Sequence, residues 1–354
     1  MRNPFQSTHY ESAQSMATML QVAKKAGVSL TTVSHVINKT RFVSDEVTMR
    51  VQAAMQELDY QPNALARSLR RGETRTLGLI LPDSANPFFA EIGHAIEMEA
   101  FNAGYSVILC NTEDEARKEL LYTDVLSKKQ VDGMIFVATG EQSDSVQNVL
   151  RLDLPLVLVD RQLPAVDTDA VLTDNHLGGA MAAQYLTDLG HHKLACITGP
   201  SHLTPSADRV TGFLETLEAA GIDRSSVRLE RGDFHPESGY QAGIQLLSKP
   251  EELPSAVFCS NDLMAIGLCR AVMEHGLRIP EDISILGFDD IELSKYFNPP
   301  LTTIRQPKAE IGQVAVSMLL ERIKDHRLPA RQKVFKPQLQ ERRSCGVSLT
   351  TGIS

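Results

Sequence analysis

Apolar positions recur at helical spacing in the first part of the chain. Val47, Val51, Met55 and Leu58 are three or four residues apart and predict one face of a helix that starts after Ser44. Asp45 and Glu46 would stand in the first turn of this helix, where acidic side chains interact favourably with the helix dipole.

Two shorter helices are predicted upstream. Thr18 and Gln21 form a capping-box pattern, so the first helix should begin near Met19, and Gly27 should end it. After a two-residue turn, a second helix covers residues 30–38. The spacing of Ala23, Gly27 and Val33 is typical of a helix-turn-helix: a small residue at the crossing, a turn residue and a shared core residue.

Short polar side chains occupy the outward positions of the second helix. In a helix-turn-helix such side chains reach base edges in the major groove of DNA, whereas a solvated helix face is the plainer alternative. The candidate base-reading residues are Ser29, Thr31, Thr32, Ser34, His35 and Asn38.

From residue 76 the pattern changes to short apolar runs separated by helical segments. The runs TLGLIL, SVILC, GMIFV, LVLV, LACIT, AVFCS and ISILG each have the length of a buried strand. Residues 88–103 show helical periodicity between two of them. This alternation predicts parallel α/β sheets, and about 270 residues of it suggest two lobes.

Polar and aromatic side chains follow the ends of these strands, which is where open α/β sheets bind ligands. Carboxylate, amide and guanidinium groups can pair with sugar hydroxyls while phenyl rings pack on C–H surfaces. Taken singly, such residues are often helix caps or core. The candidate ligand-binding residues are Asn86, Phe88, Phe89, Asp160, Arg161, Arg209 (in a predicted loop), Phe234, Asn261, Asp289 and Gln306.

Composition narrows the class of protein. The 354 residues are 42% hydrophobic, which excludes a wholly disordered chain, and no apolar run has the length of a membrane helix. Five Cys without a CxxC pair argue against a disulfide framework or a cysteine-based zinc site.

No secretory signal is visible, so a cytoplasmic location is expected. No catalytic motif stands out, so no enzyme is expected, and neither a metal nor a cofactor. The pair His191–His192 is expected in a surface turn.

Charge is uneven along the chain. The net charge is −9, yet residues 16–75 hold nine Lys and Arg against five Asp and Glu. A basic head on an acidic body is typical of a nucleic-acid-binding module joined to another domain.

The segment LQVAKKAGVSLTTVSHVINKTRFVSDEVTMRVQAAMQELDYQPNALARSLRRG resembles the DNA-binding head of the LacI family of bacterial transcription regulators. The resemblance implies a helix-turn-helix head over residues 16–62, a hinge helix and linker over 63–75, and an extension, expected to be disordered, over 1–15. It implies that Leu69 wedges into the minor groove. It also implies further DNA contacts from Asn63, Ala64 and Arg70.

The remaining sequence resembles the effector-binding and dimerisation core of the same family over residues 76–345, with a tail over 346–354. This core shares the two-lobed fold of periplasmic sugar-binding proteins. Stretches such as LCNTE and PPLTTIRQPK resemble family members that respond to ribose, and GDFHPESGY resembles members that respond to purines. The ten strand-end residues match the pattern by which bacterial ribose-binding protein holds ribose, so D-ribose is the favoured effector. Hypoxanthine or guanine, or another pentose or hexose, is the alternative.

These features predict a sugar-responsive repressor that binds double-stranded operator DNA as a homodimer and has no membrane partner. A transport-type solute-binding protein would explain the body but not the helical head. A sugar-modifying enzyme would require a catalytic set that the sequence does not show.

Overall fold

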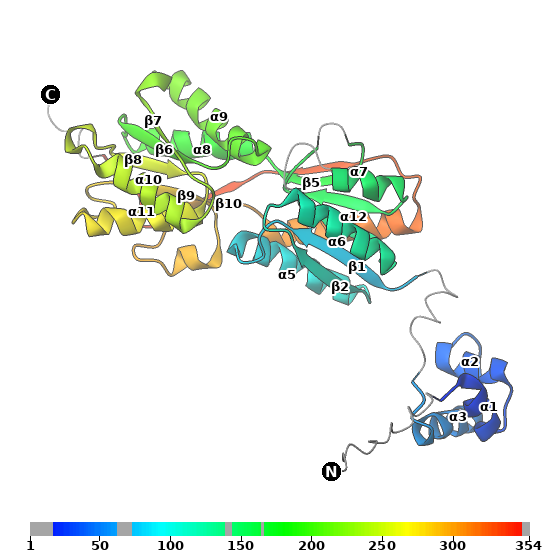
Figure 1. Ribbon diagram of the computed structural model, residues 1–354. Coiled ribbons are helices and arrows are strands. Elements are labelled where there is room, and N and C mark those ends of the chain that lie inside the picture. The colour runs from blue at the N-terminus through cyan, green and yellow to red at the C-terminus, as the bar shows by residue number, and fades with distance from the viewer. Residues whose placement is uncertain (1–16, 62–72, 139–143, 164–165, 349–354) are drawn as a thin grey trace, which may run out of the picture. The chain divides into compact units, whose positions relative to one another are not determined.

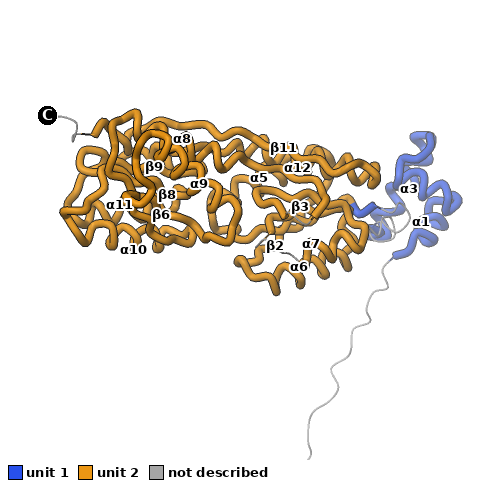
Figure 2. The backbone as a smooth tube through the Cα atoms, turned by 90° about the horizontal axis from the view of Figure 1, so that it is seen from above, with its two compact units in different colours: residues 1–74 blue, residues 75–354 orange. Residues whose placement is uncertain are grey.

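The computed structural model describes residues 17–61, 73–138, 144–163 and 166–348. The chain forms two compact units, residues 1–74 and 75–354 (Figure 2). The first is called the head below, and the second the effector unit. The expected extension over residues 1–15 and most of the expected hinge over 63–75 lie outside the described residues.

Three helices build the head (Figure 1): α1 (Met19–Ala26), α2 (Leu30–Asn38) and α3 (Asp45–Glu57). The predicted capping box is present, since Gln21 N–H donates to the Thr18 hydroxyl and the Gln21 side chain accepts from Thr18 N–H. Gly27 ends α1 at a positive φ of 64°, a conformation that costs glycine little. All three predicted helices are therefore confirmed.

Small and branched apolar side chains from all three helices form the core of the head. Arg50 of α3 also donates from Nη2 to the carbonyl oxygen of Ala26 at 2.5 Å, which satisfies an acceptor at the end of α1. The fully or largely buried core residues are Val22, Ala23, Ala26, Val33, Val51 and Ala54.

The effector unit holds two six-stranded sheets, each in its own lobe. The first sheet is entirely parallel, in the order β11-β5-β4-β3-β1-β2. Its strands are β1 (Thr76–Leu81), β2 (Ser106–Asn111), β3 (Gly133–Phe136), β4 (Leu156–Val159), β5 (Asp169–Thr173) and β11 (Gln332–Phe335). Its helices are α5 (Pro87–Asn102) and α12 (Lys308–Lys324) on one face, and α6 (Ala116–Lys128) and α7 (Asp144–Arg151) on the other.

The second sheet has the order β12-β10-β9-β8-β6-β7, and only the β10–β12 pair is antiparallel. Its strands are β6 (Leu194–Thr198), β7 (Arg228–Arg231), β8 (Ala256–Cys259), β9 (Ser284–Asp289), β10 (Thr302–Arg305) and β12 (Gln338–Gln340). Helices α8 (Asn175–Asp188) and α9 (Thr204–Ala219) cover one face, and α10 (Pro236–Leu247) and α11 (Asp262–Glu274) the other. Three short 3₁₀ turns complete the lobe: η1 (Arg224–Ser226), η2 (Pro250–Glu252) and η3 (Glu292–Lys295).

Three segments connect the lobes: β5 to α8, β10 to α12, and β11 to β12 (Figure 1). The chain thus enters the second lobe at residue 174, returns at 306–307 and enters it again at 336–337. The seven predicted strands all form, which confirms the two-lobed parallel architecture. Five strands were not among the predicted runs, because segments such as RLER and QKVF have no continuous apolar run. They are β5, β7, β10, β11 and β12.

The prediction of a surface turn at His191 is wrong. His191 is buried, with its Nδ1 2.9 Å from the Ser255 hydroxyl and its Nε2 2.9 Å from the carbonyl oxygen of Gly346. These contacts, with a bond from Ser348 N–H to the Leu189 carbonyl, hold the start of the predicted 346–354 tail against the second lobe. Burial lowers the pKa of His191, which favours the neutral ring.

Candidate effector site and nucleic-acid interface

A cavity of about 330 Å³ lies where the strand ends of the two lobes face each other. Nine of the ten predicted side chains line it, together with Leu203 and Pro205, which the sequence did not single out. The nine are Asn86, Phe88, Phe89, Asp160, Arg161, Arg209, Phe234, Asn261 and Asp289.

The first lobe contributes the start of α5. Asn86 is the N-cap of this helix, and its Oδ1 accepts from Phe88 N–H at 3.0 Å. The rings of Phe88 and Phe89 meet edge to face with their centroids 5.1 Å apart. Asn86 can therefore cap α5 through Oδ1 and also present its Nδ2 group to a ligand in the cavity.

Asp160 and Arg161 follow β4 at the cavity wall. Asp160 has a left-handed backbone, with φ of 67°, and such conformations in non-glycine residues cluster at functional sites. The Arg161 guanidinium is buried and donates from Nη1 to the Ala138 carbonyl at 2.6 Å and to Asp114 Oδ1 at 3.2 Å. Burial raises the pKa of Asp160, although Arg161 and Arg209 partly offset this effect.

Arg209 is the largest polar group from the second lobe. The predicted loop is wrong here: Arg209 lies in α9, because Thr204–Pro205 begins a helix with proline in its first turn. Its guanidinium is buried and stacks on the Phe288 ring, 3.7 Å from the centroid. Nη1 lies 3.5 Å from Asp289 Oδ1, so a cation and a carboxylate share this wall.

Phe234 and Asn261 occupy neighbouring positions on the same wall. Phe234 has a φ of 71°, and its carbonyl oxygen accepts from Asn261 Nδ2 at 2.9 Å. Asn261 also caps α11, since its Oδ1 accepts from Met264 N–H at 2.9 Å. As at Asn86, the cap holds the side chain in a fixed orientation at the cavity.

Asp289 ends β9 with a φ of 109°. Gln306 does not line the cavity but donates from Nε2 to Asp289 Oδ1 at 2.8 Å. The buried Oε1 of Gln306 has no hydrogen-bond partner among the described residues. Burial raises the pKa of Asp289 to about 7, against the opposing effect of Arg209.

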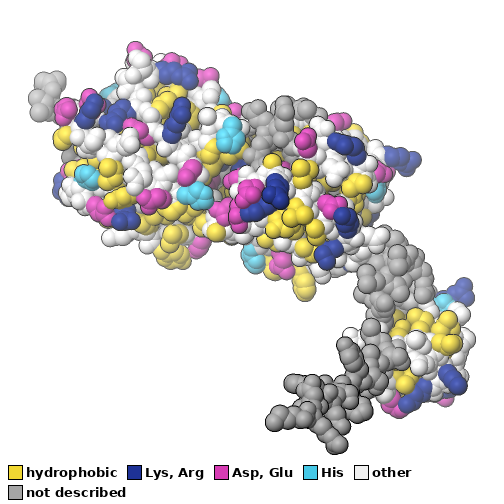
Figure 3. Space-filling view, viewed as in Figure 1, with side chains coloured by type: hydrophobic (Ala, Val, Ile, Leu, Met, Phe, Trp, Pro, Cys, Tyr) yellow, Lys and Arg dark blue, Asp and Glu magenta, His cyan; other side chains and the backbone are white. Residues whose placement is uncertain are grey.

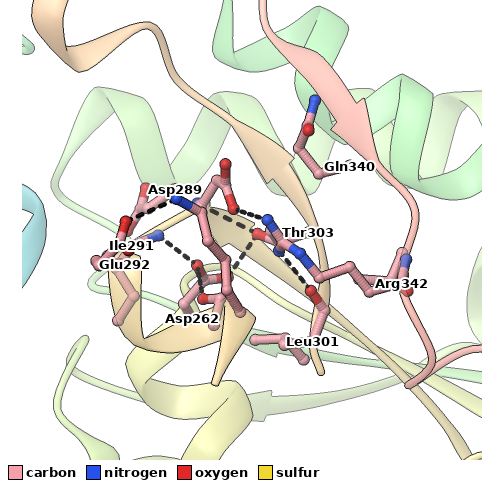
Figure 4. A network of polar contacts seen from close by, with 12 residues as sticks. Asp262, Asp289, Ile291, Glu292, Leu301, Thr303, Gln340 and Arg342 are labelled. Carbon is pink, nitrogen blue, oxygen red and sulfur yellow. Dashed lines mark hydrogen bonds and ion pairs between the residues drawn. The ribbon is translucent and has the colours of Figure 1, made fainter. Parts of the chain in front are cut away.

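A polar network under Asp289 was not predicted (Figure 4). The buried carboxylate of Asp262 accepts from Ile291 N–H at 2.9 Å, from the Ser294 hydroxyl at 2.6 Å and from the Thr303 hydroxyl at 2.5 Å. Lys308 donates to the backbone oxygens of Asp289 and of the next residue at 2.7 and 2.6 Å. The network therefore fixes the strained backbone that presents Asp289. Sequence alone could not reveal it, because members such as Asp262 and Lys308 are 46 residues apart.

The predicted DNA-reading residues lie on α2 of the head. Thr31 is exposed, whereas the Ser29 hydroxyl caps the helix by accepting from Thr32 N–H at 3.1 Å. His35 Nδ1 lies 2.7 Å from the Thr40 hydroxyl, and Asn38 donates from Nδ2 to the Ser34 carbonyl at 2.9 Å. Because these side chains already make hydrogen bonds within the head, they would contact DNA bases through polar atoms that these bonds do not use. The other four predicted DNA contacts, Asn63, Ala64, Leu69 and Arg70, lie outside the described residues.

Apolar side chains also reach the surface of the head (Figure 3). Phe42, between α2 and α3, is 94% exposed, and Leu20 and Met49 are also largely exposed.

In the described part of the chain, no helix is long and apolar enough to cross a membrane. Within the same residues, no group of three or more His, Cys, Asp or Glu could hold a metal ion.

Comparison with known proteins identifies the family. Residues 18–63 match the bacterial regulatory proteins of the lacI family, and residues 183–345 match the periplasmic binding protein-like domain. The chain is 42% identical to the ribose operon repressor of Escherichia coli (strain K12), over 93% of this chain and 100% of that relative. The chain belongs to the LacI family. This LacI-family protein is a DNA-binding transcription repressor and not an enzyme.

Other relatives of the repressor have different names and bound ligands. The repressor is 43% identical to the HTH-type transcriptional repressor PurR of Proteus mirabilis, over 93% of this chain and 97% of that relative. A LacI family regulator from Enterococcus faecium with bound ribose superimposes with a TM-score of 0.71 at 32% identity, over 77% of this chain and 99% of that one. The lac repressor dimer bound to operator gives 0.83 at 29% identity, over 93% and 99%. Overall identity therefore does not settle the effector of this chain.

Proposed function

We propose that this LacI-family repressor controls a sugar-utilisation operon and leaves its operator when a small sugar, D-ribose, binds between its lobes. The observation that carries the proposal is the lining of the cavity, where two carboxylates and two guanidinium groups alternate with three phenyl rings. Sugar hydroxyls can donate to Asp160 and Asp289 and accept from Arg161 and Arg209, while the rings pack on the C–H faces.

The lining favours ribose over a purine. An amide before the aromatic pair and an adjacent Asp–Arg pair are the pattern expected for ribose, and Asn86, Asp160 and Arg161 supply them. Hypoxanthine and guanine are the alternative effectors, because the stretch GDFHPESGY resembles family members that respond to purines.

The DNA-binding half of the proposal rests on the head and on the solved lac repressor dimer bound to operator. Two copies of α2 in a homodimer would enter successive major grooves of a roughly palindromic operator. Ser29, Thr31, Thr32, Ser34, His35 and Asn38 are the proposed contacts on this helix. Asn63, Ala64, Leu69 and Arg70 are proposed contacts of the hinge.

Isothermal titration of the full-length protein with D-ribose, hypoxanthine and guanine tests the effector. We expect heat with ribose only, and a loss of affinity of about 10- to 100-fold on Asp160→Asn, because a hydrogen bond to a charged group contributes about 1.5–3 kcal/mol. Asp153→Asn is the control, since this carboxylate is 93% exposed and does not line the cavity. Heat with a purine and none with ribose would reject the sugar.

Operator binding is tested separately with Leu69→Ala. If Leu69 wedges into the minor groove, the variant should bind operator more weakly while its affinity for ribose stays unchanged. Unchanged operator affinity in a gel-shift or anisotropy titration would contradict the wedge.

A further inference from the structure

Arg209 is held from three sides inside the second lobe. Its Nε donates to Asn175 Oδ1 at 2.8 Å, its Nη1 donates to the Ser260 carbonyl at 2.6 Å, and its planar face lies on Phe288. Nη2 makes no hydrogen bond or ion pair with the described residues, so this edge of the guanidinium is the one left for a ligand. The bond to Asn175 therefore determines the direction in which the free edge lies.

Asn175 is the first residue of α8, directly after the segment that connects the lobes. Its side chain is buried, with 5% of the residue exposed, and its Nδ2 donates to the Thr173 carbonyl at 3.1 Å. Thr173 is the last residue of β5 in the first lobe. One amide group thus joins the end of a first-lobe strand to the guanidinium that lines the cavity in the second lobe.

The backbone around these two residues has little freedom. Helices α8 and α9 pack so closely that a Cβ on Gly179 would lie 1.9 Å from the Arg209 carbonyl oxygen. Similarly, a Cβ on Gly212 would lie 2.0 Å from the carbonyl oxygen of His176. Because the backbones are fixed by this contact, the orientation of the Arg209 side chain depends on its hydrogen bonds.

We propose that Asn175 is a positioning residue, which orients Arg209 for the sugar and links the sugar site to the lobe connection at Thr173. The inference rests on the proposed sugar site. Its two bonds have separate roles: Oδ1 aligns the guanidinium, and Nδ2 passes a change at Arg209 to the connecting segment, about which the lobes would turn.

Two substitutions separate these roles. Asn175→Asp keeps an acceptor for Arg209 Nε but loses the donor to the Thr173 carbonyl, whereas Asn175→Ala loses both. Gln184→Ala, an exposed position on the same helix, is the matched control. Thermal unfolding followed by circular dichroism checks that each variant folds, and Asn175→Asp preserves the volume of the side chain if the alanine variant does not fold.

The first readout needs no sugar. In the full-length protein labelled with ¹⁵N-arginine, the Nε–H of Arg209 should give a resonance protected from solvent exchange in the wild type and in Asn175→Asp. Arg209→Lys assigns this resonance by removing it. We expect Asn175→Ala to lose the protection. A protected resonance in Asn175→Ala would overturn the positioning role.

The second readout is coupling between the two ligands, measured as the ratio of operator affinities without and with saturating D-ribose. We expect Asn175→Ala to weaken ribose binding about 10-fold or more. Asn175→Asp should keep ribose affinity within about threefold but reduce the coupling ratio about fivefold or more. Wild-type coupling in Asn175→Asp would overturn the link to the lobe connection. If the wild type gives no heat with ribose, the proposed effector is wrong, and the Arg209 resonance still decides whether Asn175 positions this side chain.

Discussion

Acidification should weaken sugar binding by this repressor through Asp289. Burial raises the pKa of Asp289 to about 7, and the ionised carboxylate is the form that both pairs with Arg209 and accepts from a sugar hydroxyl. With a pKa of about 7, roughly one-tenth of the carboxyl is ionised at pH 6 and nine-tenths at pH 8. If only the ionised form binds well, ribose affinity should rise by about tenfold between pH 6 and pH 8.

Isothermal titration at pH 6, 7 and 8, in buffers of different ionisation enthalpy, measures both the affinity and the protons released on binding. Asp289→Asn should bind more weakly at every pH and lose most of the pH dependence. Asp153→Asn is the control, because this exposed carboxylate does not line the cavity and its loss should leave the pH dependence unchanged. Equal ribose affinity of the wild type at pH 6 and pH 8 would refute the reasoning.

The same shift has a consequence for folding. A carboxyl with a raised pKa in the folded state binds a proton more tightly there than in the unfolded chain, where the pKa is near 4. Its contribution to the free energy of unfolding is therefore largest below pH 4 and is lost as the pH rises toward 7. Asp289→Asn should remove this dependence.

Two further substitutions test the packing of the effector unit. Gly179→Ala should lower the melting temperature and cost about 1–3 kcal/mol of stability, because its Cβ would collide with the Arg209 carbonyl oxygen. Gly93→Ala is the control and should be close to neutral, because the nearest side-chain atom to its Cβ is 3.4 Å away. Equal melting temperatures for both variants would contradict the close contact between α8 and α9. Asp169→Ala should cost about 3–5 kcal/mol in denaturant unfolding, because this fully buried carboxylate pairs with two arginines that would lose their partner. Those arginines also lower the pKa of Asp169, so the stability that this residue contributes should be lost as the pH falls through its folded-state pKa. Asp124→Ala, which breaks an exposed pair with Lys128, should cost less than about 1 kcal/mol. A similar loss of stability in both variants would argue against the buried pair.

Local pattern determined the head and most of the strands. The capping box at Thr18, the turn at Gly27 and the spacing of Val47, Val51 and Met55 act within a few residues of each other, so they could be read directly. The strands themselves could also be read from local apolar runs. Their ends predict a shared ligand site, because parallel sheets gather the residues that follow each strand at one edge. That rule placed seven of the nine side chains at the cavity, whereas Phe234 follows the unpredicted β7 and Arg209 lies within α9.

Tertiary structure alone decided how those side chains are held. Asn175 and Arg209 are 34 residues apart, and His191 is buried by a contact with Gly346 that is 155 residues distant, so neither could be anticipated from neighbouring residues. Strands β11 and β12 have little apolar character of their own and form because β5 and β10 offer them hydrogen-bonding edges. Short-range periodicity specifies which elements form and which residues end them, whereas the orientation of a buried polar group depends on partners that only the folded chain brings within bonding distance.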